Sequence, residues 1–336
     1  LVQRTGSALQ QGWALFALAR QARRMDDVER ARKALAEALE ATAAAAGSPR
    51  GDALRSLCQL GLAWCDYQER RYDAAQKRLD RGFLHPGAGE AAQHNPRLRA
   101  EWLNLQALLL KSRITARWPR GASEEDVERV FACFGEALLC AIEADAFTLI
   151  ESVSSNLGYA TWLLKVGARG EHGTDGATRL EAIRWLLLSE WYRQRHGLAA
   201  RSLWNLLSAC RIARGGLPYA AKPLRAPASP LPHDEVRERL WPFGELLGAP
   251  RQTPHWHTVT EQLLGDLRAQ PKAHSRLETA TVLLEHAWQT VLRERSLRKA
   301  LPLLRELEEL LSAMNRVDRA FFEGELKSLR EGLGWA

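Results

Sequence analysis

Apolar residues recur at helical spacing along almost the whole chain, and this periodicity constrains the fold more than any other feature. In segment 27–46, Ala31, Leu35, Ala38 and Leu39 fall on one face of a helix, because residues three or four positions apart share a face. No alternating run of apolar and polar residues is long enough for a sheet. The sequence therefore predicts an all-α protein.

The kind of hydrophobic residue supports this prediction. Leu, Ala and Trp are prominent, whereas the β-branched residues and Tyr are scarce; Leu and Ala favour helices, and β-branched residues favour strands. With 46% hydrophobic and 26% charged residues, the composition is that of a globular protein and excludes wholesale disorder. No apolar run reaches the length of about 18 residues that a membrane span needs, so we expect no membrane partner.

Turn-forming residues divide the periodic segments. We expect helical repeats over 1–214, a Pro- and Gly-rich linker or surface excursion over 215–233, and less regular C-terminal helical repeats or capping helices over 234–336. The predicted helices are 8–24, 27–46, 52–69, 72–83, 97–117, 124–144, 147–166, 177–195, 199–214, 234–247, 255–269, 273–294, 297–313 and 316–332.

A short pattern recurs within the first helix of successive pairs. It consists of an amide residue followed by Leu, and the steps between the amides are 45 (104−59), 52 (156−104) and 49 (205−156) residues. Recurrence at such a period is typical of stacked helical repeats. The four copies are Gln59-Leu60-Gly61, Asn104-Leu105-Gln106, Asn156-Leu157-Gly158 and Asn205-Leu206-Leu207.

These residues resemble the tetratricopeptide repeat family over roughly 8–214. Trp102-Leu103-Asn104-Leu105 is similar to that family's first helix, and Ala31, Leu35 and Ala38 are similar to its second. The units here are longer than the family's 34 residues, and its closing Pro is mostly absent. The resemblance implies a right-handed α-solenoid of stacked antiparallel helix pairs, in which the first helices line a concave groove that binds peptides or partner helices.

If the resemblance holds, the groove is basic and contains aromatic residues. Its positions carry seven basic side chains and one acidic side chain, Asp66, whereas the whole chain carries 47 basic and 40 acidic residues. Guanidinium and aromatic groups together suit an acidic, partly apolar ligand. The candidate residues are Arg20, Arg23, Arg24, Arg55, Gln59, Asn104, Lys111, Asn156, Tyr159, Trp162, Arg201, Trp204, Asn205 and Arg211, and Trp13 and Phe16 share the groove positions.

A structural interpretation of the same residues stays open. A mid-helix Asn is often bonded to a neighbouring carbonyl group, and a Trp in a helical stripe often belongs to the core. The charge bias also depends on the register chosen for each helix.

Motifs of catalysis and metal binding are missing from the sequence. There is no His-Glu-x-x-His, Gly-x-Ser-x-Gly or Gly-x-x-x-x-Gly-Lys motif. His255 and His257 have a poor spacing for a metal pair in a helix, and Cys58 and Cys65 are two helical turns apart, too far for a disulfide. We predict no enzyme activity, no metal and no cofactor.

The sequence therefore predicts a cytoplasmic protein-interaction scaffold, sensor or adaptor that binds an acidic peptide or partner segment. An odd number of cysteines, five, fits reduced thiols in the cytoplasm. The alternative is a nucleic-acid-binding helical array whose Arg-rich face follows phosphates, which the net charge of +7 also suits. Because the chain begins at Leu1 without an initiator Met, a preceding domain is an open alternative.

Overall fold

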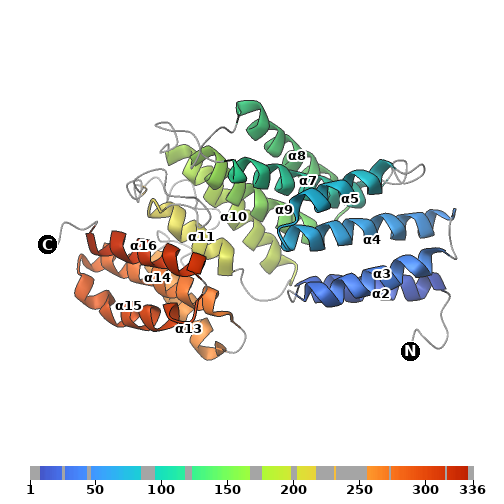
Figure 1. Ribbon diagram of the computed structural model, residues 1–336. Helices are drawn as coiled ribbons and strands as arrows, with labels where there is room; N and C mark the ends of the chain where they lie inside the picture. The colour runs from blue at the N-terminus through green and yellow to red at the C-terminus, as the bar shows by residue number, and fades with distance from the viewer. Residues whose placement is uncertain are drawn as a thin grey trace. The chain divides into compact units, whose positions relative to one another are not determined.

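A computed structural model describes residues 8–24, 27–43, 47–84, 95–117, 123–166, 176–197, 203–216, 231, 256–271, 274–314 and 316–331. These residues form helices and turns and contain no β-strand (Figure 1), which confirms the all-α prediction. Among them, no helix has the length and apolar character that crossing a membrane requires.

The contacts between residues divide the chain into two compact units, Leu1–Val153 and Ser154–Ala336, with the division inside helix α9 (Phe147–Ala160). The predicted linker over 215–233 and the predicted helix over 234–247 lie almost entirely outside the described residues. The predicted boundaries at 214 and 234 therefore stay predictions.

Unit 1 consists of helices that pack mainly on their neighbours in sequence. α2 packs on α3 and α4, α3 on α4, α4 on α5 and α7, α5 on α7, and α7 on α8. We call α2, α4 and α7 the first helices of unit 1, because each contacts the helix that follows it and at least one other first helix. Their bounds are α2 Ala8–Arg24, α3 Val28–Ala43, α4 Pro49–Gln68, α5 Tyr72–Leu84, α7 Pro96–Ala116 and α8 Glu124–Glu143.

Unit 2 shows the same order of contacts. α10 packs on the π-helical turn η1 and on α11, α11 packs on α13 and α14, and α14 packs on α13, α15 and α16. This sequential packing is compatible with a helical repeat. The bounds are η1 Thr161–Val166, α10 Gly176–Arg195, α11 Leu203–Ala213, α13 Trp256–Ala269, α14 Arg276–Glu294, α15 Leu297–Leu311 and α16 Arg316–Glu331.

Side-chain caps set several helix starts. The Ser48 hydroxyl accepts a hydrogen bond from the Gly51 N–H at 3.1 Å, so α4 begins at Pro49, three residues before the predicted start. The Asn95 side chain caps α7 in the same way, and the Ser123 side chain caps α8 by accepting from the Asp126 N–H at 3.0 Å. Each cap satisfies a backbone donor that the helix itself leaves without a partner.

The recurring amide-Leu pattern marks positions of close helix packing. Its leucines, Leu60, Leu105, Leu157 and Leu206, are all buried. Where Gly follows the Leu, a neighbouring helix comes very near. A Cβ atom added at Gly158 would lie 2.9 Å from the Ala182 carbonyl oxygen of α10, so only Gly fits there without displacement.

Candidate functional site

A small hollow of about 10 Å³ lies among the three first helices of unit 1, which the sequence predicted to line the ligand groove. Most of its lining comes from α2, α4 and α7, and Leu35 comes from α3. Basic, acidic, aromatic and aliphatic groups therefore meet in one place. The lining residues are Phe16, Ala19, Arg20, Arg23, Leu35, Leu57, Gly61, Trp64 and Glu101.

Aromatic rings hold the two guanidinium groups of this hollow. The Arg23 guanidinium carbon lies 4.7 Å from the centroid of the Trp64 ring, well within the range of a cation–π contact. The Arg20 guanidinium carbon lies at the edge of that range, 6.0 Å from the Phe16 ring. Both Arg side chains are half-buried, so they are partly ordered and still reach the surface.

Glu101 brings a carboxylate to the same hollow. Its residue is only 8% exposed, and its Oε1 atom accepts no hydrogen bond from any described residue. A buried acceptor that lacks a donor costs free energy. Glu101 was not among the predicted groove residues, because it lies three residues before Asn104, at a position that the resemblance does not place in the groove.

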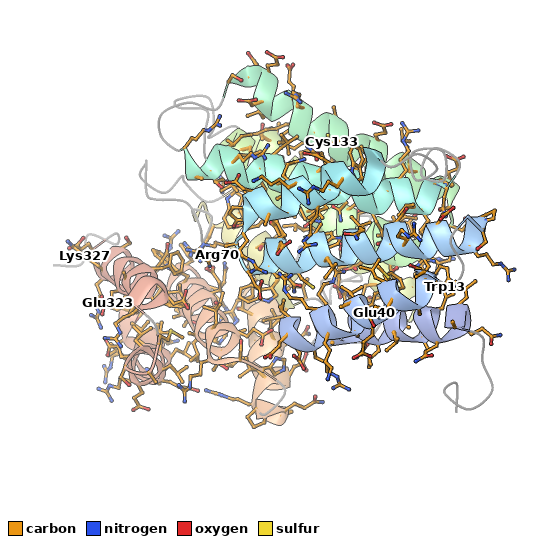
Figure 2. The ribbon with its side chains drawn as sticks, turned by 45° about the vertical axis from the view of Figure 1, so that its right-hand side comes forward. Trp13, Glu40, Arg70, Cys133, Glu323 and Lys327 are labelled. Atoms are coloured by element: carbon orange, nitrogen blue, oxygen red, sulfur yellow. The ribbon has the colours of Figure 1, made fainter. Side chains whose placement is uncertain are left out.

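Aromatic and polar residues continue around the hollow. Trp13 of α2, labelled in Figure 2, is 36% exposed and its ring contacts Phe16 edge-on at 6.2 Å between centroids. Arg55 and Gln59 of α4 are half-buried. These residues extend the surface of the first helices beyond the hollow.

Other predicted groove residues of unit 1 are buried. Asn104 and Lys111 of α7 are 1% and 9% exposed, and burial lowers the pKa of the Lys111 ammonium to about 8. The Arg24 side chain lies outside the described residues, as does Arg201.

Asp66, the acidic residue of the predicted groove, is occupied by internal contacts. Its carboxylate accepts from Arg32 Nη2 at 2.7 Å, from Arg71 Nη2 at 2.8 Å and from Arg78 Nε at 2.7 Å. Burial alone would raise the pKa of Asp66, but the bonds from Arg32 and Arg78 lower it below its usual value. The side chain is 2% exposed, so it connects α3, α4 and α5 and does not face a ligand.

In unit 2, Asn205 of α11 serves helix packing. Its Oδ1 atom accepts from the Ser155 hydroxyl at 2.7 Å, and its Nδ2 atom donates to the Ser189 hydroxyl at 2.9 Å. The amide therefore connects α9, α10 and α11 and fits the structural interpretation of a mid-helix Asn. Trp162 is also in the core at 2% exposure.

The remaining aromatic and amide candidates of unit 2 are more accessible. Asn156 and Tyr159 of α9 are half-buried, and Trp204 of α11 is 41% exposed.

Arg211 belongs to a buried cluster of ion pairs in unit 2. Its Nη2 atom lies 2.7 Å from Glu325 Oε1, and its Nη1 atom lies 3.3 Å from Glu285 Oε1. Arg214 contacts the same two carboxylates, with Nε–Oε2 at 2.7 Å to Glu285 and Nη2–Oε2 at 2.9 Å to Glu325.

Rings cover both guanidinium groups of this cluster. Arg211 lies over Phe321 and Arg214 over Trp288, each at 4.6 Å from the ring centroid. The Trp288 Nε1–H also donates to Glu325 at 3.2 Å. Burial by itself would raise the pKa of Glu325, but the two Arg side chains lower it below its usual value. These contacts connect α11, α14 and α16.

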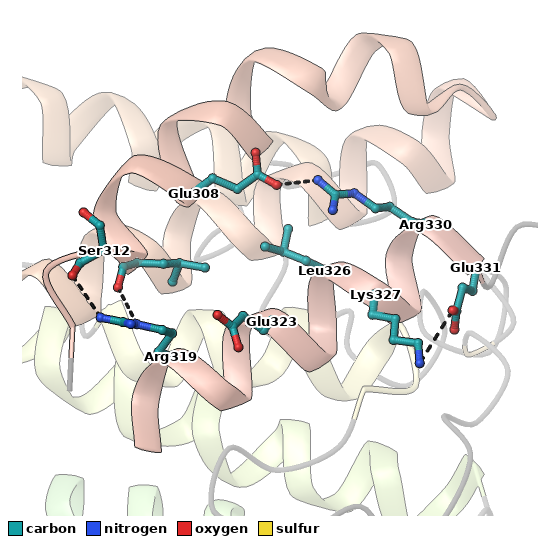
Figure 3. A pocket seen from close by; sticks show the side chains of 9 residues that line it. Glu308, Ser312, Arg319, Glu323, Leu326, Lys327, Arg330 and Glu331 are labelled. Carbon is teal, nitrogen blue, oxygen red and sulfur yellow. Dashed lines mark hydrogen bonds and ion pairs between the residues drawn. The ribbon is translucent and has the colours of Figure 1, made fainter. Parts of the chain in front are cut away.

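A larger hollow, of about 500 Å³, lies between α15 and α16 (Figure 3). Its charged groups mostly pair with each other or with backbone groups. Arg330 pairs with Glu308, and Arg319 donates to the carbonyl oxygen of Leu311 at 3.0 Å and to that of Ser312 at 2.9 Å. Its lining residues are Glu308, Leu311, Ser312, Arg319, Glu323, Leu326, Lys327, Arg330 and Glu331.

Comparison with known proteins adds no relative. The sequence matches no protein-family model, and searches of curated proteins and of solved structures find no match.

Proposed function

We propose that this chain is a non-catalytic scaffold, sensor or adaptor of the tetratricopeptide-like, right-handed solenoid type. It binds an acidic segment of a partner protein on the first helices of unit 1. The observation that carries the proposal is the hollow in which Arg20 and Arg23 lie beside aromatic rings.

Ring contacts favour binding by these guanidinium groups. A side chain that is already partly ordered loses less conformational entropy when a ligand binds. A guanidinium group donates two parallel hydrogen bonds to a carboxylate, and such charge-assisted bonds are the stronger ones.

The proposed site is confined to unit 1 for a structural reason. In unit 2, the side chains of Asn205 and Arg211 are buried and engaged in internal contacts. A ligand would have to break these contacts before it could use either residue, and breaking a buried ion pair is costly.

The test uses a fluorescein-labelled peptide of twelve residues in which Glu alternates with Leu and Ser. We expect Arg20→Glu with Arg23→Glu to weaken its binding about tenfold or more, because each charge-assisted hydrogen bond contributes roughly 1.5–3 kcal/mol. Arg30→Glu with Lys33→Glu is the matched control. It makes the same change in net charge at exposed positions of α3, away from the first helices. Equal losses in the two double variants would refute a specific site.

A nucleic acid is the second candidate ligand, because the chain carries seven more basic than acidic residues. A single strand of twenty thymidines distinguishes the two. If the chain follows phosphates, the strand binds more tightly than the acidic peptide, and its affinity falls steeply with salt, with a slope set by several released counterions. Binding of the peptide in preference to the strand supports the protein ligand.

We also propose a cytoplasmic location. All five cysteines are free thiols. Burial raises the pKa of the Cys58 thiol to about 12, and it also raises the pKa of the Cys210 thiol above its usual value. Such thiols behave as small apolar core residues, as is usual in a reducing compartment.

A further inference from the structure

The outer face of α8 and the start of α9 expose large apolar side chains. Leu139 is 69% exposed, Ile142 is 50% exposed and Phe147 is 41% exposed. Single exposed hydrophobic residues are common on protein surfaces. Here, however, three occur within the stretch 139–147, and two of them, Leu139 and Ile142, continue a regular pattern along α8.

The pattern has the spacing of residues that face a partner helix in a coiled coil, and we call the residues that follow it on α8 the seam. Glu128, Ala132, Gly135, Leu139 and Ile142 follow one another at steps of four, three, four and three residues, which keeps them on one side of α8. The opposite side is buried and includes Val127, Val130, Phe134 and Ala137. α8 therefore has one side in the core of unit 1 and a second, exposed side with the repeat of a coiled coil.

Small residues widen the N-terminal half of this seam. Ala132 is exposed, and a Cβ atom added at Gly135 would meet no atom within 4 Å. Side chains of a second helix therefore have room over Ala132 and Gly135, while Leu139 and Ile142 supply the apolar contact. A seam with small residues in one half and large apolar residues in the other gives a partner helix both room for its side chains and apolar contact.

Charge indicates which helix fits. α8 carries six acidic residues and one basic residue, Arg129, although the whole chain has a net charge of +7. Glu136 and Glu143 flank the seam, and Glu136 pairs with Arg99 of α7. A second α8 from another copy, or an anionic membrane, would bring like charges together, which is unfavourable.

We propose that the exposed seam of α8 is a docking surface for a basic amphipathic helix of a partner protein. The distance along the axis from residue 128 to residue 142 is about 21 Å at 1.5 Å per residue, so about four turns of the partner helix lie on it. Lys or Arg side chains of that helix pair with the acidic flank, and its apolar stripe covers Leu139, Ile142 and Phe147. This surface does not include the hollow of the first helices and takes a ligand of the opposite charge.

The first test compares three synthetic peptides of 21 residues by fluorescence anisotropy with the full chain. One places Leu at the seam positions and Lys elsewhere, the second replaces Lys by Glu, and the third scrambles the Leu/Lys peptide so that it has no apolar face. We expect the Leu/Lys peptide to bind at least tenfold more tightly than either of the others. Equal binding of the scrambled peptide would show general attraction to negative charge and overturn the proposal.

The second test changes the seam itself. Leu139→Ser with Ile142→Ser should weaken binding of the Leu/Lys peptide at least tenfold, because it removes apolar contact and leaves every charge in place. Leu301→Ser on α15, which is 38% exposed, is the matched control and should change nothing. Because these side chains are exposed, the thermal unfolding midpoints of all variants should stay close to that of the wild type.

Two outcomes would assign the seam to another occupant and overturn the proposal. One is a dimer in sedimentation velocity that the Leu139→Ser, Ile142→Ser variant abolishes. The other is binding of the wild type, but not of this variant, to neutral phosphatidylcholine vesicles.

Discussion

Replacing Gly158 by Ala provides the sharpest test of how α9 and α10 pack in unit 2. The added Cβ would lie 2.7 Å from Leu186 Cγ and 2.9 Å from the Ala182 carbonyl oxygen. Leu186 can rotate, but the carbonyl group belongs to the backbone of α10. The two helices therefore have to separate by several tenths of an ångström.

Two opposing effects set the magnitude. Ala is favoured over Gly inside a helix by about 1 kcal/mol, whereas overpacking a well-packed interface costs about 1–3 kcal/mol. Because one contact is with backbone, we take the upper part of that range and expect a net loss of about 2 kcal/mol. For a unit of this size, a loss of 1 kcal/mol in the free energy of unfolding lowers the midpoint of thermal unfolding by about 2–4 °C. The midpoint of the Gly158→Ala variant should therefore fall by about 4–8 °C.

Gly265→Ala is the matched control in the same unit. Gly265 lies within α13, and an added Cβ there would meet no atom within 4 Å. Only the preference for Ala over Gly inside a helix remains, so the substitution should raise the midpoint of thermal unfolding by about 2–4 °C. Scanning calorimetry of the full chain measures both variants. If Gly158→Ala proved as stabilising as Gly265→Ala, the close packing of α9 on α10 would be refuted.

Three further predictions concern buried ionisable groups and are measured by urea denaturation. Glu285→Gln leaves Arg211 and Arg214 with one carboxylate, so the free energy of unfolding should fall by about 3–5 kcal/mol; a loss below 1 kcal/mol would contradict the buried cluster. Burial lowers the pKa of His286 to about 4, below the unfolded value of about 6.5. The unfolded state then binds more protons between these values, and wild-type stability should fall as the pH drops from 6.5 to 4, by up to about 3 kcal/mol. His286→Gln should reduce this slope, and an unchanged slope would exclude His286 as its source. Lys111, with its pKa of about 8, should make the wild type more stable as the pH rises from 8 to 10.5, and Lys111→Met should remove that rise; a rise that persists in the variant would assign it to another group.

Several helix boundaries were predictable from local signals. α2 has the predicted bounds, 8–24, and α5 and α8 differ from prediction by a single residue at their C-terminal ends. Periodicity locates a helix because the buried face repeats every turn. The start of α4 was predicted three residues late, because the capping contact of Ser48 was not recognised.

The candidate site was predictable only in part. Arg20 and Arg23 do lie together at a hollow on the first helices, and periodicity places them on one face of α2. Trp64 and Glu101 were not among the predicted residues, although both line that hollow. The rotation of each helix against the next decides which side chains of α4 and α7 meet α2. The spacing of apolar residues within one helix does not report that rotation.

The sequence by itself determined that the chain is helical, which faces are apolar and where the packing leucines and glycines lie, because each of these is a property of residues within a few turns. Tertiary structure alone decided which polar side chains are available to a ligand. Arg211 and Asp66 were both expected in the groove, yet both pair internally. Arg214 pairs with Glu325 across 111 positions of the chain. Such pairing arises only when distant helices come together in the fold, and the same stacking leaves Arg20 and Arg23 at a surface.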